Sequence, residues 1–135
     1  MPTAIMIHGA FCAGWAFEAF REPFEARGWT VLAPDLPGHE PGGGVAGLSM
    51  SDYARSVVRL CEGLPEPPVL IGHSMGGLVC QLAARRVKPA ALALLAPSPP
   101  WGVMRYSTAG STELLGGEFR YTTFFDCSSP SKCSG

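Results

Sequence analysis

A serine enclosed by glycines stands between a predicted strand and a predicted helix. The segment from Gly72 to Gly77 reads GHSMGG, and it joins the apolar run at 69–71 to an apolar-periodic stretch at 75–86. A serine in so sharp a turn takes a strained backbone conformation that lifts its hydroxyl clear of the sheet. Glycines two residues before and after it remove side chains that would clash. The G-x-S-x-G pattern in this context predicts that Ser74 is a nucleophile. The Met75 N–H, at the helix N-terminus, is then placed to stabilise an oxyanion.

A glycine-rich turn between a strand and a helix can also bind a phosphate or a dinucleotide. A phosphate-binding loop would need Gly-Lys-Ser/Thr, and a dinucleotide-binding loop would need G-x-G-x-x-G. Neither pattern is present in the sequence. A turn that only packs closely remains the alternative to a nucleophile.

A second glycine turn follows the first predicted strand, at 3–7, and reads His8-Gly9-Ala10-Phe11. An oxyanion hole needs two N–H donors, and one of them can come from a loop that follows such a turn. Ala10 is the expected donor. Phe11 is the next choice as donor and is expected to contact the substrate.

The hydrophobic pattern predicts strands that alternate with helices. The expected strands are 3–7, 29–33, 69–71 and 90–96, and the expected helices are 15–27, 50–63 and 75–86. Pro23 is expected to kink or split the first helix, and Ser49 with Asp52 forms a capping-box pattern before the second. This order predicts an α/β fold with three layers, αβα, around a parallel sheet. A strand order 2-1-3-4 would bring both glycine turns to the switch point between the first and third strands.

Handedness also predicts where the helices lie. Right-handed crossovers place the helix at 15–27 on one face of the sheet and the other two helices on the opposite face. The strand at 90–96 carries no charge or proline that would protect a sheet edge. We therefore expect self-association through this exposed strand edge unless residues 98–126 cover it.

Composition and charge exclude several classes of protein. Ten basic and eleven acidic residues give a net charge of −1, so no nucleic-acid partner is expected. The longest apolar run, at 90–96, is too short to span a membrane. No signal-peptide pattern opens the sequence, and a cytoplasmic location is expected. The five cysteines show no metal-ligand spacing, so no zinc site is expected.

These motifs together resemble the α/β-hydrolase fold family, in particular its serine esterases and lipases. The resemblance rests on HGAFCAGW after the first strand, DLPGHE at 35–40 and GHSMGG at 72–77, and it covers about residues 3–102. It implies a hydrolase of carboxylic esters or similar acyl substrates, in which Ser74 attacks the acyl carbon and neither a metal nor an organic cofactor takes part. Residues 1–102 would be a partial α/β-hydrolase core, and 103–135 an irregular, truncated or disordered tail.

The sequence departs from the family pattern after the nucleophile. Family order is nucleophile, acid, histidine, but the histidines here are His8, His39 and His73, and none follows Ser74. The candidate acids after it are Glu113, Glu118 and Asp126. His39 is expected to be a structural turn residue and is the one candidate for a substitute base. The resemblance therefore implies only the N-terminal half of the fold, a truncated hydrolase without the triad acid and histidine. The alternative is a non-catalytic fragment or pseudoenzyme that binds a small ligand or a protein partner.

Overall fold

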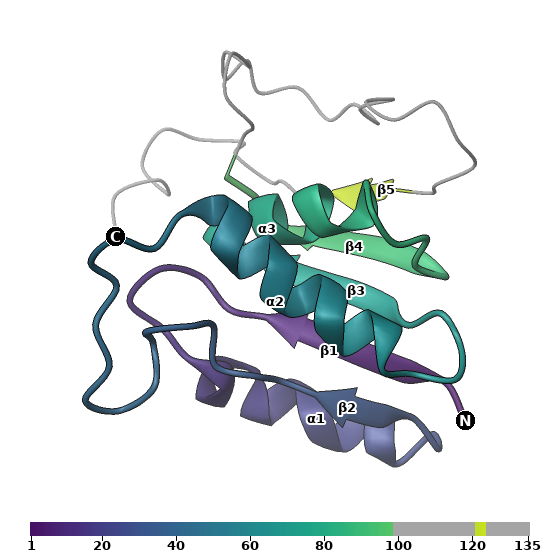
Figure 1. The fold of residues 1–135 in the computed structure, drawn as a ribbon. Coiled ribbons are helices and arrows are strands. Elements are labelled where there is room, and N and C mark those ends of the chain that lie inside the picture. Colours follow the sequence, from purple (N-terminus) through teal and green to yellow (C-terminus); the bar gives the residue numbers. More distant parts are fainter. Residues whose placement is uncertain (99–120, 124–135) are drawn as a thin grey trace, which may run out of the picture.

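The computed structural model describes residues 1–98 and 121–123 (Figure 1). Strands and helices alternate along the chain, as the hydrophobic pattern predicts. The elements are β1 (Thr3–Ile7), the 3-10 helix η1 (Gly14–Phe17), α1 (Glu18–Glu25), β2 (Thr30–Leu32), α2 (Met50–Glu62), β3 (Val69–His73), α3 (Met75–Ala84), β4 (Ala91–Leu95) and β5 (Tyr121–Thr123).

The strands form one parallel sheet in the order β2-β1-β3-β4-β5. The predicted α/β class and the order 2-1-3-4 of the first four strands are confirmed. Ile7 pairs with Gly72 across β1 and β3, and His73 pairs with Leu95 across β3 and β4. The carboxyl ends of the three central strands therefore meet at one edge of the sheet, where both glycine turns begin.

Helices cover both faces of the sheet, as right-handed crossovers require. Figure 1 shows α2 and α3 on the near face and α1 beyond the sheet. Alternate residues of β1 enter two separate cores: Ile5 and Ile7 pack with α2 and α3, whereas Ala4 and Met6 pack with Phe17. These four side chains of β1 are all fully buried. The three-layer arrangement is therefore confirmed, with β1 as the most buried strand.

The first predicted helix is divided, but not at Pro23. The break lies between η1, which ends at Phe17, and α1, which begins at Glu18. Pro23 lies inside α1, where it has no N–H to donate to the Ala19 carbonyl and its ring crowds that carbonyl. Gly28 follows the helix with φ = +81°, a conformation that favours glycine after a helix end.

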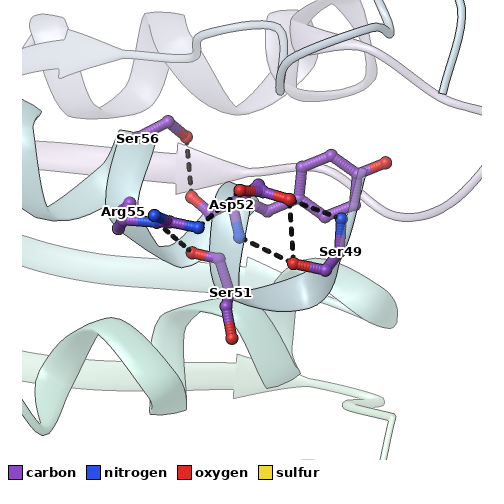
Figure 2. Close-up of polar contacts among 6 residues, drawn as sticks. Ser49, Ser51, Asp52, Arg55 and Ser56 are labelled. Carbon is purple, nitrogen blue, oxygen red and sulfur yellow. Dashed lines mark hydrogen bonds and ion pairs between the residues drawn. The ribbon is translucent and has the colours of Figure 1, made fainter. Parts of the chain in front are cut away.

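The start of α2 is held by the predicted capping box (Figure 2). The Ser49 hydroxyl accepts the Asp52 N–H at 3.3 Å, and the Asp52 carboxylate accepts the Ser49 N–H at 2.8 Å. The Ser49 hydrogen bonds and the neighbouring Arg55 hold the pKa of the Asp52 carboxyl below its usual range. The helix therefore begins at Met50, with the backbone N–H groups of Ser49 and Asp52 both hydrogen-bonded by the box.

Part of the edge of β4 is covered, which is the case that the expectation of self-association excepts. β5 pairs with β4 in parallel, with Leu92, Ala93 and Leu94 opposite Tyr121, Thr122 and Thr123. The sequence around β5 lacks a strand pattern, and three residues are too short a run to recognise. The expected boundary between 102 and 103, and the rest of the predicted tail, lie outside the described residues.

Candidate active site

Ser74 occupies a strained turn between β3 and α3. Its backbone has φ = 52° and ψ = −120°, a region that side chains rarely enter. The Ser74 N–H donates to the Leu95 carbonyl at 3.0 Å, and the Ser74 carbonyl accepts the N–H groups of Gly77 and Ser98, each at 2.9 Å. Both polar groups of the backbone are therefore fixed by β4, by the segment after it and by α3, which holds the turn in its strained shape.

The glycines around Ser74 lie where a side chain has no room. A β-carbon at Gly72 would lie 2.5 Å from the Gly76 carbonyl oxygen, and one at Gly77 would lie 2.6 Å from the Pro97 β-carbon. A β-carbon at Gly76 would collide with the carbonyl groups of Ile7, the last residue of β1, and of His8, which follows it. The steric role predicted for these glycines is confirmed.

The turn after β1 lies beside Ser74. A β-carbon at Gly9 would be 3.2 Å from the Ser74 β-carbon, so the two glycine turns are in contact. Ala10 follows in an exposed turn, and Phe11 is fully exposed with φ = 60°. Within residues 1–98 and 121–123, neither the Ala10 N–H nor the Met75 N–H has a hydrogen-bond partner. Each of the two turns thus carries one N–H group that has no partner among the described residues.

The histidines are placed differently from one another. His8 is fully buried, and both of its ring nitrogens have backbone partners. His39 packs against His8 and against Tyr53 of α2, with ring centroids 5.0 and 5.4 Å apart. His73 is exposed at the end of β3. No histidine is hydrogen-bonded to the Ser74 hydroxyl in the part of the chain that the structure describes.

The contacts of His8 could not be anticipated from sequence. Its Nε2 accepts the Leu36 N–H at 2.9 Å, which joins two loops that follow different strands. Burial lowers the pKa of His8 and is the largest influence on it, and the nearby His39 lowers it further. The Gly9 carbonyl and the Asp35 carboxylate act in the opposite direction. His8 is thus a neutral, hydrogen-bonded ring beneath the site.

No helix among the described residues is both long and apolar enough to cross a membrane. Among the same residues, no group of three or more histidine, cysteine or carboxylate side chains is arranged to hold a metal ion.

The strand order and the strained glycine turn that carries Ser74 are those of an α/β-hydrolase framework. A family model described as "Alpha/beta hydrolase family" matches residues 4–130. The chain therefore belongs to the α/β-hydrolase family.

Similar proteins are esterases and hydrolases. The chain is 41% identical over 75 residues to the pyrethroid hydrolase of Sphingobium wenxiniae, an alignment covering 54% of this chain and 27% of that protein. It is 32% identical over 131 residues to the pimeloyl-[acyl-carrier protein] methyl ester esterase of Chromobacterium violaceum, covering 90% of this chain and 50% of that one. The crystal structure of a pyrethroid hydrolase from Sphingobium faniae JZ-2 superimposes with a TM-score of 0.65 at 36% identity, over 71% of this chain and 40% of that chain. The chain thus spans half or less of the length of these relatives.

Proposed function

We propose that Ser74 is the nucleophile of a site that cleaves carboxylic esters. The observation that carries this proposal is the strained Ser74 backbone at the start of α3, held between β4 and the turn after β1. Strain of this kind, about 1–3 kcal/mol, is kept where it serves a site. Esterase names among the similar proteins support the ester as the substrate class.

In the proposed reaction the Ser74 hydroxyl oxygen attacks the acyl carbon and loses its proton to a base. The carbonyl oxygen becomes an oxyanion, which accepts hydrogen bonds from the N–H groups of Ala10 and Met75. Collapse of this intermediate breaks the ester bond, and the alcohol leaves with a proton. Water then attacks the acyl-serine, releasing the acid and restoring the hydroxyl.

Electrostatics supports Met75 as one of the donors. Its N–H is the first of α3, a ten-residue helix, and a helix N-terminus carries partial positive charge. Phe11 is proposed as a substrate contact because it stands fully exposed beside Ala10. A large apolar side chain at the mouth of the site would bind the organic part of an ester.

The base is the missing part. No histidine follows Ser74 in the 135-residue sequence, and a serine hydroxyl without a positioned base is a weak nucleophile. We expect this chain to turn over esters slower than a complete serine esterase by a factor on the order of 10⁴ or more. The same observation favours the second candidate function, a chain that binds a ligand or a partner at this site without cleaving it.

Covalent labelling separates the two candidates. The purified chain is incubated with a fluorophosphonate probe, and intact mass and peptide mapping locate the adduct. We expect one slow adduct on Ser74, none on Ser74→Ala, and an unchanged rate for Ser51→Ala, which alters an exposed serine of α2. A wild-type chain that gains no adduct would contradict the nucleophile and favour binding alone.

Turnover of an activated short-chain aryl ester is the second measurement. Hydrolysis at ordinary esterase rates that Ser74→Ala abolishes would show that a base is present. His39→Ala then tests the substitute base, because loss of the rate would assign that role to His39 and an unchanged rate would remove it.

Self-association and a cytoplasmic location stay predictions. Self-association was expected through the edge of the strand at 90–96. Among the described residues, β5 pairs with Leu92 to Leu94, which is only part of that edge. Sedimentation at micromolar concentration tests it, and a stable monomer that binds no hydrophobic dye would contradict it.

A further inference from the structure

The imidazole of His8 joins the turn after β1 to the loop after β2. The Leu36 N–H lies 2.9 Å from Nε2, and a backbone N–H can only donate, so Nε2 carries the lone pair. The proton is therefore on Nδ1, which donates to the Gly9 carbonyl oxygen at 2.7 Å. The ring is fully buried, so water does not compete for either bond.

The bond to Gly9 also determines the direction of the next N–H. The Gly9 carbonyl and the Ala10 N–H belong to the same peptide group, which is planar and trans. They therefore point in opposite directions. When Nδ1 holds the Gly9 oxygen toward the buried ring, the Ala10 N–H must point away from the ring, and it has no partner among the described residues. It belongs to the turn that contacts Ser74 through Gly9.

A second tie holds the far end of the same loop. The Gly14 N–H donates to the Asp35 carboxylate at 2.8 Å, and a β-carbon at Gly14 would collide with the Ala33 carbonyl. The loop between His8 and Gly14 is thus anchored at both ends by the segment after β2. These ties restrict the rotation of the peptide group between Gly9 and Ala10.

We propose that His8 is a positioning residue, which aims the Ala10 N–H at the oxyanion by holding the Gly9 carbonyl. This inference rests on the proposed oxyanion role of Ala10. His8 does not touch the reacting atoms and acts only through the peptide group that it orients. The effect is on the transition state, because a donor aimed in advance is worth most when charge develops on the oxygen.

Two variants separate the two hydrogen bonds of the ring. In His8→Asn the amide nitrogen lies near the position of Nδ1, so the bond to Gly9 is retained and the bond to Leu36 is lost. In His8→Gln the side-chain oxygen reaches the position of Nε2, so the bond to Leu36 is retained and the bond to Gly9 is lost. Tyr53→Phe is the control, because it alters the packing behind His39 and leaves both His8 bonds in place.

The first readout is the rate at which the fluorophosphonate modifies Ser74, divided into the limiting rate and the half-saturating concentration. We expect His8→Gln to lower the limiting rate by about 10-fold to 100-fold, since it misdirects one oxyanion donor, with the half-saturating concentration unchanged. His8→Asn and Tyr53→Phe should stay within about threefold of the wild type. Equal losses in both His8 variants that track their thermal midpoints would overturn the proposal, because they would mean that His8 only stabilises the fold.

The second readout does not need a reactive serine. The amide resonance of Ala10 and its hydrogen exchange are measured by NMR in the same four proteins. We expect the Ala10 amide to change in His8→Gln and not in His8→Asn, and the Leu36 amide to show the reverse. An Ala10 amide that is identical in all four proteins would overturn the positioning role. A wild-type Ser74 that never reacts would instead contradict the proposed function, and the amide data would still decide this inference.

Discussion

The backbone of Gly76 lies against the carbonyl oxygen of Ile7, so α3 begins in direct contact with the end of β1. A β-carbon at Gly76 would collide with this oxygen and with the carbonyl of His8. Backbone atoms of a fully buried strand cannot move aside as a flexible side chain can. The approach that brings the two glycine turns together therefore depends on a missing methyl group.

Gly76→Ala should destabilise the fold strongly for this reason. We expect the free energy of unfolding to fall by about 2–3 kcal/mol, as for other insertions into a packed core. Gly44→Ala is the matched control, because a β-carbon there meets nothing within 4 Å, and its effect should stay within about 0.5 kcal/mol. Urea unfolding followed by circular dichroism measures both. Equal midpoints for the two variants would contradict the close approach.

The strain at Ser74 predicts an unusual order of stability. Glycine accepts φ = 52° without the steric cost that a β-carbon brings, whereas alanine keeps that cost. We expect Ser74→Gly to be more stable than Ser74→Ala by about 1 kcal/mol, after allowing for the greater entropy of glycine in the unfolded chain. At Ser56, within α2, the order should reverse, since glycine in a helix costs about 1 kcal/mol relative to alanine. Thermal unfolding of the four variants provides the comparison, and the same order at both positions would show that the Ser74 backbone is unstrained.

The capping box of α2 predicts a local loss. Ser49→Ala removes the hydroxyl that accepts the Asp52 N–H, and the expected cost is about 1 kcal/mol. Ser51, in the first turn of α2, has a hydroxyl for which the described residues offer no partner (Figure 2). Ser51→Ala should therefore change stability by less than about 0.5 kcal/mol. Denaturant midpoints distinguish the two. A neutral Ser49→Ala would mean that the box adds nothing in solution.

His8 predicts that stability falls in mild acid. The unfolded chain binds a proton at His8 near the ordinary pKa of 6.5, whereas burial keeps the folded ring neutral to lower pH. The unfolded state thus binds more protons below pH 6.5, and the folded state loses about 1.4 kcal/mol per pH unit until its own His8 titrates. The charged and titratable groups facing the ring are His39, which acts with burial, and Asp35, which opposes it.

The measurement is the free energy of unfolding from about pH 7.5 to pH 5. Subtracting the curve of His8→Gln, which cannot titrate, isolates the contribution of the ring. Asp52, whose pKa is lowered from 3.8, loses its contribution only in more acidic solution and does not overlap this window. A difference curve that is flat would show that the buried ring does not resist protonation.

Much of the framework was predictable because the sequence alternates apolar strands with apolar-periodic helices. β1 matched its predicted range, and the observed strand order is the one that was expected to bring the two glycine turns together. The ends of the elements were less predictable. β3 continues beyond Ile71 to His73, because its pairing with β4 persists through two residues that look like part of the turn.

The site was predictable in its local parts and not in its long-range parts. Ser74 and its glycines form one short motif whose steric reason is local. The bond between His8 and Leu36 joins residues far apart in sequence, and no local pattern marks a backbone N–H as a partner. β5 was missed for a related reason, since its place is defined by the edge of β4 and not by its own three residues.

The pairing of Ala4 with Val69 has a consequence for how the chain folds. The whole of α1, β2 and α2 separates the two strands, so their ladder closes a long loop before it gains any contact. Closing such a loop is entropically costly, and parallel sheets of this kind form slowly. The turn at Ser74 needs this ladder on one side and the Leu95 carbonyl on the other. We therefore expect its strain to enter late in folding, after enough of the sheet has formed to hold it.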